Sequence, residues 1–474
     1  MRSPYTPPAG SIPTLDVPEV SAARRVHMIG IGGAGMRNLA RLLMARGIEV
    51  TGSDLKDSAD LWELREAGAS VVVGHAPEHL GDPDAVVIST AVTELNVELA
   101  AARERHLPVW ARAQVLAAAA SDARTIAVAG THGKTTTTSM VALVLERAEL
   151  DPTFVVGGEP NETGSGARSG GGTWFVAEAD ESDGSFLLFR PEVGIITNVE
   201  VDHVDFYAGG REEIEAAFGA FADRCARVVV CADDPGAMRS IEGTTAEVRT
   251  YGSASDSDVR LEIRDVGPGG SSALVHVDGR TVELKLAVDG AHHLRNAGAA
   301  IAASAFAGVP AELAAEALGA FTGVHRRFEH RGSVRGAVFY DDYGHVPTEL
   351  AVTLDVARRT RPARLVAVFQ PHRYSRTQAL WRELGHSLIE ADLIIVTDVY
   401  AADQAPIPGV TGKLVVNGIN EAARGKRIVY LPHRGDVVRF LDREVREGDL
   451  VITMGCGDVW MLGDAALEHM RAAS

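Results

Sequence analysis

The sequence predicts an α/β protein with three domains, and three observations lead to this fold class. Short apolar, strand-like runs alternate with helical stretches along the chain, which is the pattern of doubly wound parallel sheets. The chain has 474 residues, too many for one hydrophobic core. Two glycine-rich turns, at residues 30–35 and 130–133, each lie between a strand and a helix. We therefore expect a Rossmann-like N-terminal domain, a central P-loop-type ATPase sheet with an antiparallel insert, and a Rossmann-like C-terminal domain.

The N-terminal region is predicted as a flexible leader over residues 1–24, followed by a first domain over residues 25–121. The leader is rich in proline and has no apolar segment of the kind found in signal peptides. The domain begins with a strand at 26–29, a glycine turn, and a helix at 36–46 that Gly47 ends. Its further strands are expected at 48–51, 71–73 and 86–89, with a helix at 97–105.

The central domain is predicted over residues 122–328. It opens with a strand at 125–129, followed by a turn and a helix that runs to Arg147. Between 259 and 288 the pattern changes to short alternating segments separated by turns, which predicts the antiparallel insert. Further strands are expected at 174–177, 193–197 and 228–231, and the segments of the insert at 261–263, 273–277 and 282–286.

The C-terminal domain is predicted over residues 329–474. Its polar clusters lie directly after strands, and ligands of open α/β sheets bind at the carboxyl ends of strands. The domain is therefore expected to bind a ligand at that edge. Its strands are expected at 338–340, 365–369, 393–397, 428–431 and 450–453.

The composition favours a globular protein of the cytoplasm. A formal net charge of -18 argues against a nucleic-acid partner, because phosphates would be repelled. The three cysteines lack the spacing of metal ligands and are expected as free thiols. The most membrane-like stretch, residues 297–321, is interrupted by Pro310 and contains two glutamates, which predicts buried helices and no membrane span. We expect a protein without a membrane partner that is a monomer or a weak homo-oligomer.

The most informative motif is the run Val128-Ala129-Gly130-Thr131-His132-Gly133-Lys134-Thr135-Thr136. Backbone N–H groups at such a turn, and at the start of the following helix, bind anions. Lys134 adds a mobile charge for the phosphates of a nucleotide, and the Thr135 hydroxyl can reach Mg²⁺. Val128 stands where a complete P-loop pattern has its first glycine. The motif predicts an ATP site; the alternative is an ordinary strand-to-helix turn with a surface lysine.

A second glycine turn, Gly30-Ile31-Gly32-Gly33-Ala34-Gly35, matches the pattern G-x-G-x-x-G between a strand and a helix. Asp54 ends the next strand, where an acid that binds ribose would stand. Alone this pattern suggests NAD, but any nucleoside diphosphate fits the same geometry. We expect a diphosphate ligand here, with a purely structural turn as the alternative.

Two strands of the central domain end in acidic residues. One is followed by Glu178-Ala179-Asp180-Glu181-Ser182-Asp183, and the next by a segment from Asn198 to Asp202 and then His203. Carboxylates are hard oxygen ligands, which suits Mg²⁺ beside a phosphate site. A solvated acidic turn is the alternative for the first run, and helix capping is the alternative for His203.

Together these motifs resemble the Mur ligases, which build the peptide of bacterial cell-wall precursors. The resemblance covers nearly the whole chain after about residue 25, and the glycine turn with the motifs at 341–345 and 372–376 is most similar to members that add the first residue. The other motifs that carry it are His292-His293-Leu294-Arg295-Asn296, Gly323-Val324-His325-Arg326-Arg327-Phe328-Glu329, Asp341-Asp342-Tyr343-Gly344-His345, Phe369-Gln370-Pro371-His372-Arg373-Tyr374-Ser375-Arg376-Thr377, and the segments 398–402 and 405–409.

The resemblance implies a substrate and a role for each domain. The first domain would bind the uridine diphosphate part of UDP-N-acetylmuramate, the second ATP and the third L-alanine. ATP would phosphorylate the muramoyl carboxylate, and the alanine amine would attack the acyl phosphate.

The resemblance also implies the site residues. By this resemblance, the catalytic residues would be Lys134, Glu178, His203, Arg326, Arg327 and Asp342. The Mg²⁺ ligands would be Thr135, Glu178 and His203, and the nucleotide would also be contacted by Asn296, which would hold the adenine, and by Arg326 and Asp342. The substrate residues would be Gly30, Gly32, Gly33, Ala34, Gly35, Asp54 and His75 in the first domain, and Tyr343, His345, His372, Arg373 and Arg376 in the third.

Several positions depart from the family pattern. Arg37 and Asn38 replace a Ser-Gly pair, His293 replaces an Asn, Val346 replaces a second His, and Cys456 replaces an Ala. The first pair is expected to bring bulk and positive charge to the diphosphate pocket. Three alternative functions stay open: a recycling ligase that attaches a whole peptide to UDP-N-acetylmuramate, an NAD(P)-dependent dehydrogenase, and a nucleotide-binding regulator without catalysis.

Overall fold

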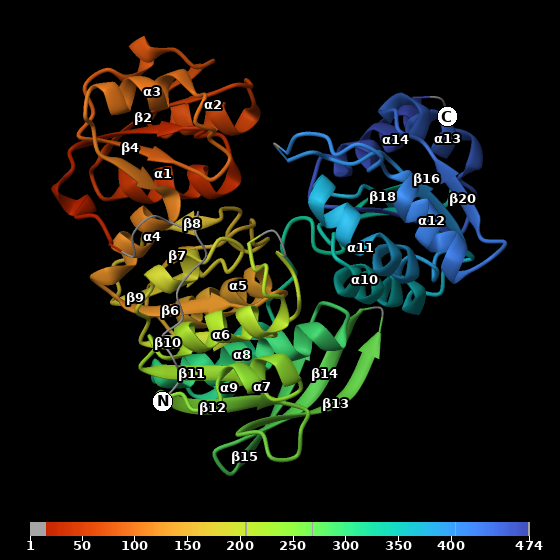
Figure 1. Ribbon diagram of the computed structural model, residues 1–474. Helices are drawn as coiled ribbons and strands as arrows, with labels where there is room; N and C mark the ends of the chain where they lie inside the picture. Colours follow the sequence, from red (N-terminus) through yellow and green to blue (C-terminus); the bar gives the residue numbers. More distant parts are fainter. Residues whose placement is uncertain (1–15, 204–205, 268, 403, 473–474) are drawn as a thin grey trace. The chain divides into compact units, whose positions relative to one another are not determined.

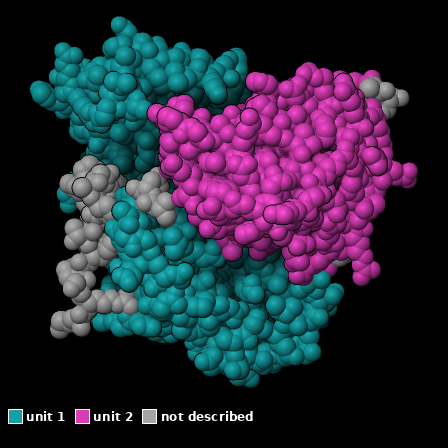
Figure 2. All heavy atoms as spheres, turned by 45° about the vertical axis from the view of Figure 1, so that its right-hand side comes forward, with its two compact units in different colours: residues 1–266, 270–322 teal, residues 267–269, 323–474 magenta. Residues whose placement is uncertain are grey.

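The computed structural model describes residues 16–203, 206–267, 269–402 and 404–472. Most of the predicted leader, residues 1–15, lies outside the described residues. The chain forms two compact units, shown in two colours in Figure 2. The first unit extends to residue 266 and includes 270–322, and the second comprises 267–269 and 323–474. The first two sheets belong to the first unit and the third sheet to the second, and together they confirm the predicted α/β fold class.

The first sheet is parallel throughout, with the strand order β3-β2-β1-β4-β5. The order reverses between β1 and β4, and in such sheets ligands bind beyond the carboxyl ends of the strands at this switch point. The glycine turn lies between the end of β1 and the start of α1, and so at this edge. Figure 1 labels β2, β4 and α1 of this domain. The strands are β1 (Arg25–Ile29), β2 (Glu49–Asp54), β3 (Ser70–Val73), β4 (Ala85–Ile88) and β5 (Val109–Ala111). The helices are η1 (Val20–Ala22), α1 (Ala34–Ala45), α2 (Ala59–Glu66), η2 (Pro77–Leu80), α3 (Val97–Glu104) and α4 (Arg112–Ser121).

The central sheet has ten strands in the order β15-β14-β13-β12-β11-β10-β6-β9-β7-β8. Strand β6, which leads into the phosphate turn, pairs in parallel with β10 on one side and β9 on the other. Strands β14 and β15 pair antiparallel, which confirms the predicted insert. The strands are β6 (Arg124–Ala129), β7 (Thr153–Val155), β8 (Ala167–Arg168), β9 (Trp174–Glu178), β10 (Val193–Ile196), β11 (Arg227–Cys231), β12 (Glu247–Gly252), β13 (Val259–Gly267), β14 (Gly270–Val277) and β15 (Arg280–Leu286).

The helices of the central domain include the one that begins at the phosphate turn. They are α5 (Lys134–Arg147), η3 (Ser185–Leu188), α6 (Arg211–Ala222), α7 (Pro235–Ser240), α8 (Ala291–Phe306) and α9 (Ala311–Leu318). The alanine-rich stretch forms α8 and α9, most of whose residues are buried, as the sequence predicts. Within the described ranges, no helix has the length and apolar character needed to cross a membrane.

The third sheet has the order β16-β17-β21-β18-β19-β20. Strand β16 pairs antiparallel with β17, and the other pairs are parallel. Alternate residues of β18 enter different hydrophobic clusters, Val366 and Val368 one and Leu365 and Phe369 the other, because successive side chains point to opposite faces. Both faces of this sheet are therefore covered. The strands are β16 (Glu329–Val334), β17 (Ala337–Asp342), β18 (Arg364–Phe369), β19 (Leu393–Val396), β20 (Arg427–Tyr430) and β21 (Asp449–Met454), and the helices are α10 (Pro347–Arg359), α11 (Tyr374–Ser387), α12 (Lys413–Ala422), α13 (Arg434–Glu444) and α14 (Trp460–Ala472).

The first two sheets are joined by direct contacts within their unit. Asn38 on α1 donates a hydrogen bond from Nδ2 to the carbonyl oxygen of Val156, at 2.9 Å. Arg37 is buried and forms ion pairs with Asp60 on α2 and with Glu159 of the central domain. The expected positive charge of Arg37 is thus held by two carboxylates, one of them in the other domain. The reason is a long-range partner that the local sequence around the glycine turn does not contain.

Candidate active site

The phosphate turn between β6 and α5 has a backbone that requires glycine. Gly130 and Gly133 have φ values of +138° and +78°. A Cβ on Gly130 would clash with Oγ1 of Thr197, and one on Gly133 would lie 2.9 Å from Oδ1 of Asn296. The turn is therefore tightly enclosed by its neighbours, and Asn296 of α8 faces it directly. The family resemblance implies that Asn296 holds the adenine of the nucleotide, and this role stays a prediction.

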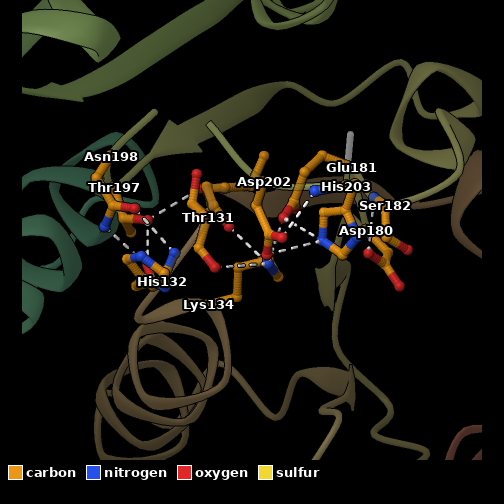
Figure 3. Close-up of polar contacts among 12 residues, drawn as sticks. Thr131, His132, Lys134, Asp180, Glu181, Ser182, Thr197, Asn198, Asp202 and His203 are labelled. Carbon is orange, nitrogen blue, oxygen red and sulfur yellow. Dashed lines mark hydrogen bonds and ion pairs between the residues drawn. The ribbon is translucent and has the colours of Figure 1, made fainter. Parts of the chain in front are cut away.

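Residues that follow β10 hold the turn in place (Figure 3). Asn198 and His132 form a reciprocal pair: the His132 N–H donates to Oδ1 of Asn198 at 2.8 Å, and Nδ2 of Asn198 donates to the His132 carbonyl at 3.0 Å. The Thr197 hydroxyl donates to the same carbonyl at 2.6 Å, and the Glu200 N–H donates to the Thr131 hydroxyl. The turn is thus fixed by side chains of the neighbouring strand end. The sequence interpretation gave Thr197 and Asn198 no role of their own, although two polar residues directly after a buried strand are a detectable signal.

Lys134 lies between the turn and the acidic residues that follow β9 (Figure 3). Its Nζ donates to the carbonyl oxygens of Gly130 at 2.6 Å and Thr131 at 3.3 Å, and to Oε1 of Glu181 at 2.9 Å. Burial alone would lower the pKa of Lys134, but the carboxylates of Glu181 and Asp180 outweigh it and raise the pKa. Lys134 is therefore a fixed positive charge at the phosphate turn.

Glu181 is a buried acid that the sequence analysis treated only as part of an acidic run, without a role of its own. Its Oε2 is buried and makes no hydrogen bond within the described part of the chain, and burial raises the pKa of its carboxyl. The ring nitrogen Nε2 of His203 lies 3.8 Å from Oε1 of Glu181 and 3.4 Å from Oδ2 of Asp202. An unsatisfied carboxylate oxygen beside other acids is a suitable donor for a hard cation, so the residues at this position fit Mg²⁺.

The three predicted Mg²⁺ ligands come from different elements. Thr135 lies in the first turn of α5, next to Thr136, and both side chains are buried. Glu178 ends β9 in register with Val128 of β6, and its Oε1 accepts a hydrogen bond from the Gly157 N–H at 2.6 Å. Among the described residues, no group of three or more His, Cys, Asp or Glu is arranged to hold a metal. Since Mg²⁺ takes few protein ligands and completes its shell with phosphate and water, the predicted set remains a prediction.

The glycine turn of the first domain is the predicted diphosphate site. Gly33 precedes α1 directly, so the N-terminus of this helix faces the turn, where an anion is favoured. The Gly30 N–H donates to the Ser53 carbonyl at 2.8 Å. Asp54 uses one oxygen to accept the Gly32 N–H at 2.9 Å, so this acid first of all stabilises the turn. His75 lies beside the same strand end, with Nδ1 2.9 Å from the Ser53 hydroxyl.

In the second unit, Arg326 is held by several acceptors. Its Nε donates to Oδ2 of Asp341 at 2.9 Å, and its Nη2 donates to the Gly455 carbonyl at 2.7 Å. The guanidinium lies 5.1 Å from the centre of the Tyr343 ring. Arg327 approaches the same ring and Glu349. Both predicted arginines thus lie beside Tyr343.

Asp342 at the end of β17 organises the backbone around it. Its oxygens accept hydrogen bonds from the N–H groups of Phe328 and Gly344, at 2.8 Å and 2.7 Å, and from the Thr353 hydroxyl at 3.0 Å. Burial raises the pKa of Asp342 to about 6, although Arg327 acts in the opposite direction. The carboxyl therefore shapes the turn that presents Tyr343.

The residues predicted to receive the amino acid are mostly brought together. The ring of His345 lies 5.7 Å from that of Tyr343 and 5.8 Å from that of His372. Nη1 of Arg376 lies 3.4 Å from Nδ1 of His372. Arg373 precedes α11 directly, and its N–H donates to the Tyr400 carbonyl at 2.8 Å. A cluster of imidazole and guanidinium groups at strand ends can bind a carboxylate.

Three predicted site residues have strained backbone. His203, Arg326 and Arg373 have φ values of +51°, +60° and +65°. Such conformations cost side-chain-bearing residues free energy and are concentrated at functional sites. Eight other non-glycine residues of the described chain also have positive φ values, so this conformation does not by itself assign a function, and the roles of the three residues stay predictions.

The remaining positions that depart from the family pattern are His293, Val346 and Cys456. His293 is buried, with its ring 4.0 Å from that of His292. Val346 is buried and precedes α10 directly. Burial raises the pKa of the Cys456 thiol to about 12, so the thiol is neutral at physiological pH.

Models of known protein families match three consecutive parts of the chain. The Mur ligase family, catalytic domain, matches residues 25–124, the Mur ligase middle domain matches 128–304, and the Mur ligase, glutamate ligase domain, matches 326–457. These three segments contain the three sheets and nearly all of the predicted site residues.

Individual relatives and solved structures agree with this division. A UDP-N-acetylmuramate–L-alanine ligase of Thermobifida fusca is 45% identical over 468 residues, which cover 95% of this chain and 98% of the relative. The structure of UDP-N-acetylmuramate-alanine ligase MurC from Thermotoga maritima has a TM-score of 0.81 and 29% identity, covering 95% of this chain and 100% of that one. A murein peptide ligase of Psychrobacter arcticus has a TM-score of 0.74 at 24% identity, covering 94% and 98%, and shares the fold. Because the similarity extends over all three sheets and almost the full length of the relatives, the chain belongs to the Mur ligase family.

Proposed function

We propose that the protein is an ATP-dependent ligase that joins L-alanine to the carboxylate of UDP-N-acetylmuramate in peptidoglycan precursor synthesis. The observation that carries this proposal is the phosphate turn. Its Lys134 donates a hydrogen bond to Glu181, and Asn198, which follows the neighbouring strand, holds the turn in place. The choice of substrate is based on full-length relatives at about 45% identity, which are named for this reaction.

The chemistry needs a good leaving group, because a carboxylate at neutral pH does not react with an amine. In the proposed reaction the γ-phosphoryl group of ATP is transferred to the muramoyl carboxylate, the alanine amine attacks the acyl phosphate, and phosphate leaves. Lys134 and the backbone N–H groups of the turn provide positive charge where negative charge gathers on the phosphates. A Mg²⁺ ion, which we propose is held by Thr135, Glu178 and His203, would neutralise further phosphate charge.

The second unit is proposed to receive the amino acid. Arg376 and His372 form one side of the cluster around Tyr343, and a guanidinium binds a carboxylate through parallel hydrogen bonds. Asp342 and the strained backbone at Arg326 hold this cluster in place. These roles come from the family resemblance, and the geometry that supports them lies within the second unit.

The proposal is tested by measuring ADP and phosphate release with ATP, Mg²⁺, UDP-N-acetylmuramate and a panel of amino acids. We expect release that requires the nucleotide-sugar and is fastest with L-alanine. Folded, Mg²⁺-supplied protein that binds ATP but releases no ADP would instead favour a regulator without catalysis. Bound NAD(P) detected by absorbance would favour a dehydrogenase.

The recycling ligase is separated from the proposed function by competition. Both enzymes use UDP-N-acetylmuramate, but the recycling ligase must admit a whole peptide. We expect a cell-wall tripeptide to be neither ligated nor able to inhibit ligation of L-alanine at equal concentration. Efficient ligation of the tripeptide would overturn the assignment to L-alanine while leaving the ligase chemistry intact.

A further inference from the structure

A buried carboxylate in the first domain collects hydrogen bonds from several directions. Glu98 lies in the first turn of α3, and its side chain is fully buried. Its Oε1 accepts hydrogen bonds from the Ala76 N–H and from Nδ1 of His79, both at 3.1 Å. Its Oε2 lies 2.5 Å from the Ser53 hydroxyl and 3.4 Å from Nε2 of His27. The mechanism proposed above uses none of these contacts.

Glu98 acts only as an acceptor in this cluster. Burial alone would raise the pKa of its carboxyl, but hydrogen bonds from His27, Ser53 and the Ala76 N–H outweigh burial and hold the pKa at about 2. The group is therefore ionised at neutral pH and carries no proton to donate. An ionised carboxylate has acceptor positions only.

This fixes the direction of the next hydrogen bond. The Ser53 hydroxyl has a single proton, and the short contact to Glu98 takes it. The Ser53 oxygen can then only accept from Nδ1 of His75, which lies 2.9 Å away. Nδ1 of His75 is also 3.4 Å from Oε2 of Glu98, where again only donation by the ring is favourable. Neutral His75 therefore carries its proton on Nδ1 and a lone pair on Nε2.

The lone pair of His75 lies at the ligand-binding edge of the first sheet. Ser53 and Asp54 end β2, and His75 follows β3, the neighbouring parallel strand. Asp54 is bonded to the glycine turn, so His75 belongs to the same edge as the predicted diphosphate site. The His75 side chain is 16% exposed, and its Nε2 has no partner among the described residues.

We propose that Glu98 and Ser53 are positioning residues that hold His75 as the Nδ1–H tautomer, so that its Nε2 accepts a hydrogen bond from the uridine of the bound nucleotide. The donor is either the N–H of the uracil ring or the 2′-hydroxyl of the ribose. The identity of the nucleotide rests on the proposed function, whereas the tautomer does not. If Nε2 of His75 contacts the base, the site prefers uridine to cytidine, because N3 of uracil is a hydrogen-bond donor and N3 of cytosine is an acceptor.

The chain of hydrogen bonds from His75 through Ser53 to Glu98, called the relay below, is tested first on the free protein, without substrate. Histidine ring nitrogens are labelled with ¹⁵N, and the His75 signals are identified by their loss in His75→Gln. We expect a protonated Nδ1 and an unprotonated Nε2 at pH 8. A protonated Nε2 in the unmodified protein would overturn the proposal, whether or not the protein ligates alanine.

Two variants test the direction of the relay. In Glu98→Gln the amide oxygen must stay at Oε1, where the Ala76 N–H and His79 donate, so the amide NH₂ faces Ser53 and reverses the relay. We expect the His75 proton to move to Nε2 in this variant. In Ser53→Ala the relay is interrupted, and we expect a mixture of tautomers. The matched control is His79→Gln, which touches Glu98 but not Ser53 and is expected to leave the His75 tautomer unchanged.

Binding separates the two donors. Calorimetry is performed with UDP, CDP, N3-methyl-UDP and 2′-deoxy-UDP as probes. Weaker binding of CDP and N3-methyl-UDP assigns the uracil N–H, and weaker binding of 2′-deoxy-UDP assigns the ribose hydroxyl. Equal binding of all four probes would overturn the proposed contact.

Steady-state kinetics test the positioning role of Ser53. We expect Ser53→Ala to raise KM for the nucleotide-sugar about tenfold with kcat within about twofold, the effect of losing one oriented hydrogen bond. A fall in kcat at unchanged KM would contradict a positioning role.

Discussion

The ammonium group of Lys134 is surrounded by oxygen acceptors, two from the phosphate turn and one from Glu181. These contacts fix its position, so little side-chain entropy is lost when a phosphate binds beside it. Electrostatic catalysis depends on charges that are already in place before charge develops on the substrate. Lys134 meets this condition because Glu181 is buried and cannot withdraw into solvent.

Replacing Lys134 by methionine keeps the volume of the side chain and removes the charge. We expect kcat for ADP release to fall by about 10²–10³-fold, the effect of removing one preorganised donor. The control is Lys285→Met, at an exposed position on β15 that pairs with Glu283, where we expect unchanged activity. Equal activity of both variants would show that Lys134 does not contact the reacting phosphate.

The pKa of Asp342 predicts a pH dependence of stability. Its carboxyl has a pKa of about 6 in the folded chain against 3.8 ordinarily, so the folded state holds this proton more tightly than the unfolded state. A raised pKa stabilises the folded state at low pH, and this contribution is lost as pH rises from about 4 to about 6, by up to about 3 kcal/mol. Asp342→Asn removes this dependence.

The measurement is urea unfolding between pH 4 and 7. Asparagine offers an N–H where Asp342 accepts two backbone N–H groups, so the variant is less stable at pH 4. We expect the stability difference between the two proteins to narrow as pH rises. The control Asp355→Asn, at an exposed position on α10, should follow the unmodified protein at a constant offset. A difference that does not change with pH would contradict the raised pKa.

Sequence reasoning identified side chains whose chemistry is explicit in their residue type, such as Lys134. It did not identify Glu181 as the partner of Lys134, because a run of acids gives no indication of which side chain points inward. It also did not identify the cluster of Ser53, His75 and Glu98, whose members lie on separate elements. Arg37 shows the same limit, since its partner Glu159 is 122 residues away.

At the scale of elements, the phosphate turn depends on a close approach between two strand ends. Gly130→Ala would place a methyl group against the Thr197 hydroxyl, at a φ of +138°. We expect a loss of about 4 kcal/mol in unfolding free energy, from overpacking added to backbone strain, together with loss of ATP binding. Thermal and urea unfolding measure the first effect, and calorimetry with ATP measures the second.

The control separates strain from the clash. Gly68 has a φ of +105°, and a Cβ there would meet no atom within 4 Å. Gly68→Ala should therefore cost only the strain of about 1–2 kcal/mol and leave ATP binding unchanged. If both variants lost the same unfolding free energy and both bound ATP, the close contact between Gly130 and Thr197 would make no contribution to stability or to ATP binding.

Most elements could be predicted because their burial is visible in the sequence. Strand β10 and residues 126–129 of β6 are continuous apolar runs, as expected for strands covered on both faces. Strands β5, β7, β8, β12 and β16 were not predicted. Strand β8 has only two residues, and β16, Glu-His-Arg-Gly-Ser-Val, is polar and lies at the edge of its sheet. Edge strands gain their pairing from a neighbour and leave little trace in hydrophobicity.

At the scale of the molecule, the first unit unites two sheets that the sequence treats as separate domains. One hydrophobic cluster contains residues of both, including Leu39 of α1 and Phe175 of β9. Arg37 adds a polar link, since its buried guanidinium pairs with Asp60 on its own side and Glu159 on the other. The helix that begins at the glycine turn is thereby anchored to the domain that contains the phosphate turn.

This anchor leads to the last prediction. Arg37→Met keeps the apolar stem and removes the charge, while Asp60 and Glu159 remain partly exposed and regain water. The loss in unfolding free energy is therefore expected near about 2 kcal/mol, below the 3–5 kcal/mol of a fully buried pair that loses one partner. A double-mutant cycle with Glu159→Gln should give a coupling of about 1 kcal/mol.

The matched control is Arg103→Met, at an exposed ion pair with Glu94, and it should lower the unfolding free energy by less than about 1 kcal/mol. If Arg37→Met and Arg103→Met were equivalent and the cycle showed no coupling, the ion pair between Arg37 and Glu159 would contribute nothing to the link between the two domains.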